Sequence, residues 1–93
     1  MLIQHNHKGQ DGTFYIQENE DVLAEMTYHM QGENIMVIDH TEVDEALRGR
    51  NIGYELVKEG VEYARQEGFK IIPVCKFAKA MFERYEEIRD TLE

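Results

Sequence analysis

The sequence predicts a mixed α+β fold in which a mainly antiparallel sheet is joined by two helices, in the order β-β-β-α-β-α. In residues 13–41 apolar side chains recur at every second position, which is typical of strands. From Ile52 the apolar spacing changes to the three-and-four pattern of a helix. A strand follows that helix, and a strand–helix–strand crossover places its two strands in parallel. At 93 residues the chain is expected to form a single domain over residues 1–93.

Three strands are predicted in the first half, over residues 13–17, 22–30 and 35–41. The segment 22–30 keeps its apolar residues at alternate positions, as a half-buried strand does. The segment 35–41 is more continuously apolar, which indicates a more buried strand. Between these two, residues 31–34 (Gln-Gly-Glu-Asn) are of the kind that joins hairpin strands. We therefore expect an antiparallel meander, and residues 2–5 are the candidate for a fourth strand before it.

The second half should contain a helix, a strand and a second helix. From Ile52 apolar and small residues lie on one helical face and charged residues on the other, as far as Gly68, where such a helix would end. Residues 69–75 then indicate a buried strand, and Pro73 within it favours an edge position or a bulge. Residues 77–92 return to helical spacing, which predicts a second helix whose charged residues form a solvated face.

Charge and composition argue against several classes of function. Asp and Glu number 19 against 10 Lys and Arg, giving a net charge of −9. Nucleic acid and anionic membranes are therefore not expected as partners, because phosphate binding needs clustered basic residues. No apolar run approaches the ~18 residues of a transmembrane helix, and no signal peptide is visible. The single cysteine, Cys75, excludes an internal disulfide and a cysteine-rich zinc site, so we expect a cytoplasmic protein.

The segment that joins the third predicted strand to the first helix is the most informative one. Gly49 and Gly53 allow a ligand to approach the backbone closely, and Asn51 tolerates a left-handed conformation. The first N–H groups of a helix lack partners and lie at the positive end of its dipole, which suits a pyrophosphate. Arg48 and Arg50 add local positive charge to an acidic chain. The spacing of the glycines matches neither a Walker A loop nor a dinucleotide fingerprint. The alternative interpretation is a turn that only joins the strand to the helix.

This segment resembles the acetyl-CoA loop of the GNAT superfamily of acetyltransferases, whose signature is Arg/Gln-x-x-Gly-x-Gly/Ala. The resemblance rests on Val43-x-x-x-x-Arg48-Gly49-x-x-Ile52-Gly53-x-x-Leu56-Val57. Asn51 stands where the first signature glycine usually lies. The chain is also similar to a short single-domain subgroup, the YjdJ-like N-acetyltransferases, over about residues 13–85. Those matches are His40-Thr41-x-Val43, Arg48-Gly49, Tyr63-Ala64-Arg65 and Pro73-Val74-Cys75.

The resemblance implies a GNAT-type fold with a splayed parallel strand pair, and acetyl-CoA as the co-substrate. In the family the strand before the loop contacts the pantetheine arm, the loop amides hold the pyrophosphate, and the thioester lies in the wedge between diverging strands. The acetyl group passes to an amine acceptor, which for this chain is either a small molecule or a protein. The implied cofactor-binding residues are Ile38, His40, Thr41, Val43, Arg48, Gly49, Arg50, Asn51, Ile52, Gly53, Tyr54 and Phe77.

Two residues are candidates for catalysis, each with a simpler alternative. Cys75 should end the strand that faces the thioester, where a thiolate could accept the acetyl group; the alternative is core packing near the pantetheine. His40, at the end of the strand beside the wedge, could take the amine proton, or could be only a hydrogen-bonded strand-end histidine. Tyr85 resembles the thiolate-protonating tyrosine of larger relatives, although a core tyrosine has the same spacing. His5 and His7 lack an evident third ligand, so no metal is expected.

Three functional hypotheses follow. The first is a minimal acetyl-CoA-dependent N-acetyltransferase, and the second is a coenzyme A or acyl-CoA-binding module with little or no turnover. The third is a small interaction domain with a vestigial loop. At 93 residues there is no room for the extra elements that line the acceptor side in larger relatives, so that side is open, completed by a dimer, or suited to a protein amine. We expect a monomer or a weak homodimer.

Overall fold

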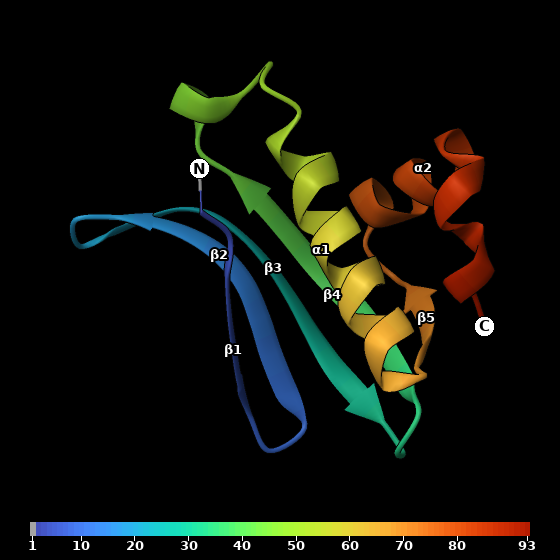
Figure 1. Ribbon diagram of the computed structural model, residues 1–93. Coiled ribbons are helices and arrows are strands. Elements are labelled where there is room, and N and C mark those ends of the chain that lie inside the picture. The colour runs from blue at the N-terminus through green and yellow to red at the C-terminus, as the bar shows by residue number, and fades with distance from the viewer. Residues whose placement is uncertain (1) are drawn as a thin grey trace.

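The computed structural model describes residues 2–93 and shows a five-stranded sheet with α1 and α2 on one face (Figure 1). The strands lie in the order β1-β2-β3-β4-β5, so that consecutive strands are neighbours. The first four pair antiparallel, and β4 pairs in parallel with β5. The predicted mixed α+β fold is therefore confirmed. The elements are β1 Gln4–Lys8, β2 Asp11–Glu18, β3 Asp21–Gln31, β4 Ile35–Val43, η1 Glu45–Leu47, α1 Ile52–Glu67, β5 Lys70–Pro73, α2 Lys76–Arg84 and η2 Glu86–Thr91.

One hydrophobic core fills the space between the sheet and the helices. It contains side chains from every strand from β2 to β5, from α1, α2 and η2, and Leu47 from η1. Burial of this apolar surface is the main force that holds the helices to the sheet. The largest side chains with almost no exposed surface are Met26, Met36, Ile38, Leu56, Ile71, Val57 and Val61.

The other face of the sheet has no helix against it in the part of the chain that the structure describes (Figure 1). Side chains alternate between the two faces of the sheet, so the residues that lie between the core residues along β2 and β3 point to this second face. They include Thr13, Glu25, Thr27 and His29, which are half-buried. We call this surface the open face of the sheet.

The first strand lies further along the chain than predicted. The sequence favoured residues 2–5, whereas β1 runs from Gln4 to Lys8. The polar His5 enters the strand because its ring stacks on Phe14, with centroids 4.1 Å apart, and its Nε2 lies 2.6 Å from the hydroxyl of Tyr28. An antiparallel partner and the aromatic contacts of His5 thus override the polar composition of the segment.

Both ends of α1 follow the local signals. Asn51 precedes it with φ of 61°, and Gly68 follows it with φ of 76°, where its N–H donates to the carbonyl of Ala64. These are left-handed conformations, which Gly and Asn adopt more easily than other residues. Among residues 2–93, neither helix combines the length and apolar character needed to cross a bilayer.

The parallel pair separates after a short ladder. It extends from Ile35 opposite Lys70 to Ile38 opposite Pro73, where β5 ends, while β4 continues to Val43. Pro73 has no N–H to donate, and this suits the end of a strand. The predicted divergence of these two strands is therefore present.

The C-terminal segment departs from the prediction of one helix over residues 77–92. α2 ends at Arg84, and Tyr85 has extended dihedral angles (φ −113°, ψ 102°) before the 3-10 helix η2 begins. The Arg89 guanidinium donates to the carbonyls of Phe82 (2.7 Å) and Glu83, and thus satisfies acceptors at the end of α2. η2 is also held to α1, because Arg65 binds both carboxylate oxygens of Asp90 at 3.1 and 2.7 Å.

Candidate functional site

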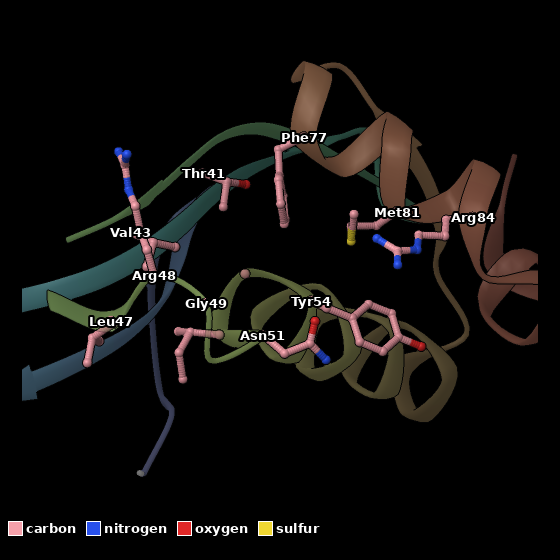
Figure 2. A pocket seen from close by; sticks show the side chains of 12 residues that line it. Thr41, Val43, Leu47, Arg48, Gly49, Asn51, Tyr54, Phe77, Met81 and Arg84 are labelled. Carbon is pink, nitrogen blue, oxygen red and sulfur yellow. The ribbon is translucent and has the colours of Figure 1, made fainter. Parts of the chain in front are cut away.

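A cleft of about 530 Å³ lies where β4, the loop before α1, and α2 meet (Figure 2). This volume is within the range of small-molecule sites. β4 supplies one wall, the loop and first turn of α1 the floor, and α2 the other wall. The lining residues are Thr41, Val43, Leu47, Arg48, Gly49, Asn51, Ile52, Gly53, Tyr54, Phe77, Met81 and Arg84.

A β-bulge in β4 decides which of its side chains face this cleft. Ile38 pairs with Tyr28, but the next pair is His40 with Thr27, so Asp39 is an extra residue. An extra residue shifts the alternation of side chains by one position. Thr41 and Val43 consequently line the cleft.

His40 is turned to the open face by the same bulge. Its side chain is 54% exposed, and its Nε2 lies 3.3 Å from a carboxylate oxygen of Glu42. Glu25 pairs with Glu42 on the neighbouring strand, and one donor atom from each of the three residues lies within 4.8 Å of the others. His40 therefore does not line the cleft, although it adjoins Thr41, which does.

The loop before α1 presents unpaired main-chain donors to the cleft. Residues 48–51 form a turn, but the N–H groups of residues 49–54 donate no hydrogen bond of ordinary length and angle to an acceptor within residues 2–93, and the first such bond of α1 is from Glu55 to the carbonyl of Asn51. Gly49 has φ of 82°, a conformation that other residues adopt rarely. The cationic side chains in the lining are Arg48 and Arg84, and the lining contains no carboxylate. This arrangement suits an anion with several oxygens.

Gly53 lets α2 approach the first turn of α1 closely. A Cβ at this position would lie 2.4 Å from the end of the Phe77 ring, so only glycine allows the ring to occupy its observed place. Figure 2 shows this ring pointing from α2 into the cleft. Phe77, Val43 and Met81 make part of the cleft apolar, next to the polar loop.

Cys75 lies beside the cleft at the point where β4 and β5 have diverged. Its N–H and that of Val74 both donate to the carbonyl of Ile38, at 3.3 and 2.8 Å. Its Sγ accepts from the N–H of Ala78 at 3.4 Å as the N-cap of α2, and lies 3.4 Å from the hydroxyl of Thr41. The thiol is half-buried and free. Thr41 thus connects the sulfur to the cleft wall.

Most of the predicted cofactor-binding residues come together here, and some lie elsewhere. Nine of them line the cleft. Ile38 is fully buried in the core, and Arg50 is exposed and outside the lining. Tyr85 stacks on Tyr54 with centroids 3.9 Å apart and is not part of the lining either. Burial, and secondarily the charge of Glu87, raises the pKa of Tyr54.

Leu47, Met81 and Arg84 also line the cleft, and none of the three was among the predicted site residues. Phe77, Met81 and Arg84 follow a spacing of four and three, which places them on one face of α2. That spacing could have identified Arg84 once Phe77 was expected at the cofactor. Leu47 carried no comparable signal, because its position depends on the short 3-10 helix η1.

Comparisons with known proteins agree with this geometry. The family model described as GCN5-related N-acetyl-transferase matches residues 13–91. Protein NATD1 of Danio rerio is 30% identical over 83 residues, which are 85% of this chain and 74% of that protein.

Solved structures show the same fold. A GCN5-like protein of Staphylococcus aureus, solved by NMR, is 37% identical with a TM-score of 0.77, over 97% of this chain and 87% of that one. A GNAT family acetyltransferase of Elizabethkingia anophelis, crystallised with acetyl-CoA bound, has a TM-score of 0.63 at 14% identity, over 84% of this chain and 52% of its own. The chain belongs to the GCN5-related N-acetyltransferase family.

Proposed function

We propose that this chain binds acetyl-CoA in the cleft and transfers its acetyl group to an amine. The observation that carries the proposal is the row of unpaired N–H groups over residues 49–54, flanked by Arg48 and Arg84. These groups match the charge of a diphosphate, and the apolar wall of Val43, Phe77 and Met81 matches a pantetheine arm. Acetyl-CoA would supply an activated thioester.

Cys75 is proposed as the residue that meets the acetyl group. The Ala78 N–H and the Thr41 hydroxyl each lie 3.4 Å from its sulfur, which holds the sulfur beside the cleft wall. The sulfur would attack the acetyl carbonyl carbon and form a thioester, while the bond to coenzyme A breaks and its thiolate leaves. An amine would then attack the acetyl-cysteine, so that the N–C bond forms and the cysteine thiolate is released.

His40 is proposed as the base for the ammonium proton. It adjoins Thr41 in sequence, but its side chain lies on the open face and outside the cleft lining, so this role requires the acceptor amine to approach from the open face. An imidazole exchanges protons near neutral pH, as this role requires. We expect the pH dependence of acetyl transfer to differ between an H40A variant and the native protein, and an unchanged profile would remove His40 from this role.

Mass spectrometry after incubation with acetyl-CoA tests the covalent route. The native protein should gain one acetyl group on Cys75, and a C75S variant should gain none at that position. Release of free thiol from acetyl-CoA, measured with a panel of primary amines, then tests turnover. A C75A protein that keeps full turnover would mean direct transfer from the thioester to the amine.

A coenzyme A-binding module without fast turnover is the second candidate. The observation in its favour is that no described helix or strand covers the open face, so the acceptor side has no wall. Coenzyme A binding with no thiol release for any amine would support this alternative.

We also propose that residues 1–93 act as one domain, because a single core cluster joins the strands from β2 to β5 with both helices. The matches at His40-Thr41-x-Val43 and Pro73-Val74-Cys75 support a place in the short YjdJ-like subgroup.

A further inference from the structure

The extra residue of the β4 bulge is held from both sides by the strand next to it. The Thr27 hydroxyl donates to one carboxylate oxygen of Asp39 at 2.5 Å, and Nδ1 of His29 lies 2.8 Å from the other. Thr27 and His29 flank Tyr28, the position at which the pairing of β3 with β4 shifts. We call Thr27, Asp39 and His29 the bulge clasp.

The carboxyl of Asp39 is suited to hold both donors. Its partial burial works against ionisation, but the bonds from Thr27 and His29 outweigh this, so its pKa lies below the ordinary value. An ionised carboxylate only accepts hydrogen bonds, so it accepts from the hydroxyl and from an Nδ1–H tautomer of His29. Both bonds lie on the open face, where side chains of β3 and β4 meet.

The bulge determines the chemistry of the cleft wall. If β4 kept its regular alternation through Asp39 without a bulge, His40 and Glu42 would point toward the cleft in place of Thr41 and Val43. That would bring a carboxylate to an anion-binding cleft and would remove the 3.4 Å contact between the Thr41 hydroxyl and the Cys75 sulfur.

We propose that Asp39 is a positioning residue for the cofactor cleft, because its clasp by Thr27 and His29 fixes the bulge that sets Thr41 against Cys75. The expected effect on coenzyme A binding rests on the proposed function. The expected effect on the conformation of β4 rests on the fold alone.

Two measurements on D39A and T27V variants test the proposal, with E59Q, an exposed site on α1, as the matched control. Isothermal titration with coenzyme A gives the Kd under conditions in which circular dichroism shows each variant to be fully folded. Proton NMR gives the contact between the Thr41 methyl group and the Cys75 β-protons without any ligand.

We expect the Kd of D39A to rise by about tenfold or more, because both hydrogen bonds to the carboxylate are lost. The Kd of T27V should rise by about threefold, because only the bond from Thr27 is lost. The Thr41–Cys75 contact should weaken in the same order, and D39N, which keeps an acceptor for Thr27, should fall between D39A and the native protein. E59Q should match the native protein in both measurements.

A purely structural role would lower the midpoint of unfolding and leave the Kd of the folded protein unchanged, and that result would overturn the proposal. If D39A does not fold, T27V decides by the same criteria. If the native protein does not bind coenzyme A, the proposed function fails, while an unchanged Thr41–Cys75 contact in the variants would separately refute the clasp.

Discussion

Replacing Gly53 with alanine tests how closely α2 packs over the first turn of α1. A Cβ on Gly53 would lie 2.4 Å from Cζ of Phe77 and 2.8 Å from Cε2, whereas ordinary contact begins near 3.4 Å. The end of the ring must therefore move by about 1.0 Å. Phe77 is 38% exposed, so the ring can turn instead of forcing the helices apart.

The two effects of this change differ in size. Alanine is favoured over glycine by about 1 kcal/mol in a helix interior and by less in the first turn, which offsets part of the cost of moving one partly exposed ring. We expect the free energy of unfolding to change by less than about 1.5 kcal/mol. Phe77 and Gly53 both line the cleft, however, so the Kd for coenzyme A should rise by about tenfold or more.

Urea unfolding and isothermal titration with coenzyme A measure the two quantities separately. G60A on the same helix is the matched control, because its Cβ would meet Cε of Met26 at 2.8 Å, the flexible end of a side chain outside the cleft lining. G60A should change stability modestly and leave the Kd unaltered. Native affinity in G53A, or an equal loss in G60A, would refute the assignment of the cleft floor.

Three further predictions concern charge and the thiol. The R48A and R84A variants should each bind coenzyme A about threefold to tenfold more weakly than the native protein, and their affinity should depend less on salt. The K79A variant, whose residue lies outside the cleft lining, should keep the affinity and the salt dependence of the native protein. Equal salt dependence in all four proteins would contradict the role of these arginines. The bonds from Arg65 lower the pKa of Asp90, and the bulge clasp lowers the pKa of Asp39 despite the opposing effect of burial. Each ionised carboxylate therefore stabilises the folded state. This stabilisation is complete above the ordinary carboxyl pKa near 4 and is lost as the pH falls through the lower pKa of the folded state. The urea midpoint should therefore fall from pH 5 to pH 3, and a D39N/D90N protein with a fall as steep as the native one would oppose this. C75A should remain folded and bind coenzyme A within about threefold of native affinity, because the sulfur lies beside the cleft and outside its lining; loss of binding in titration calorimetry would mean that Cys75 holds the cofactor itself.

Local chemistry explains why the loop and α1 could be predicted from the sequence. Asn51 and Gly68 adopt the left-handed conformations that their residue types favour, and they lie immediately before and after α1. The apolar periods of residues 22–30 and 35–41 likewise led directly to β3 and β4. In each case the deciding interactions lie within a few residues of the signal.

The features that could not be predicted depend on contacts between distant segments. The β4 bulge arises from pairing with β3 and from the bonds of Thr27 and His29 to Asp39, which period-two alternation in one strand does not reveal. The break between α2 and η2 depends on Arg89 reaching the carbonyl of Phe82. The direction of the side chains after the bulge in β4 could therefore not be predicted from the sequence, and neither could the position of His40 outside the cleft.

An ¹⁵N-resolved NMR titration of the protein with coenzyme A tests the central claim most directly. The account predicts that the amide signals of residues 49–54 shift most strongly and lose their exchange with water, because their unpaired N–H groups receive the diphosphate. Saturable shifts confined to the open face or to the far ends of the hairpins, with those amides unmoved, would contradict it.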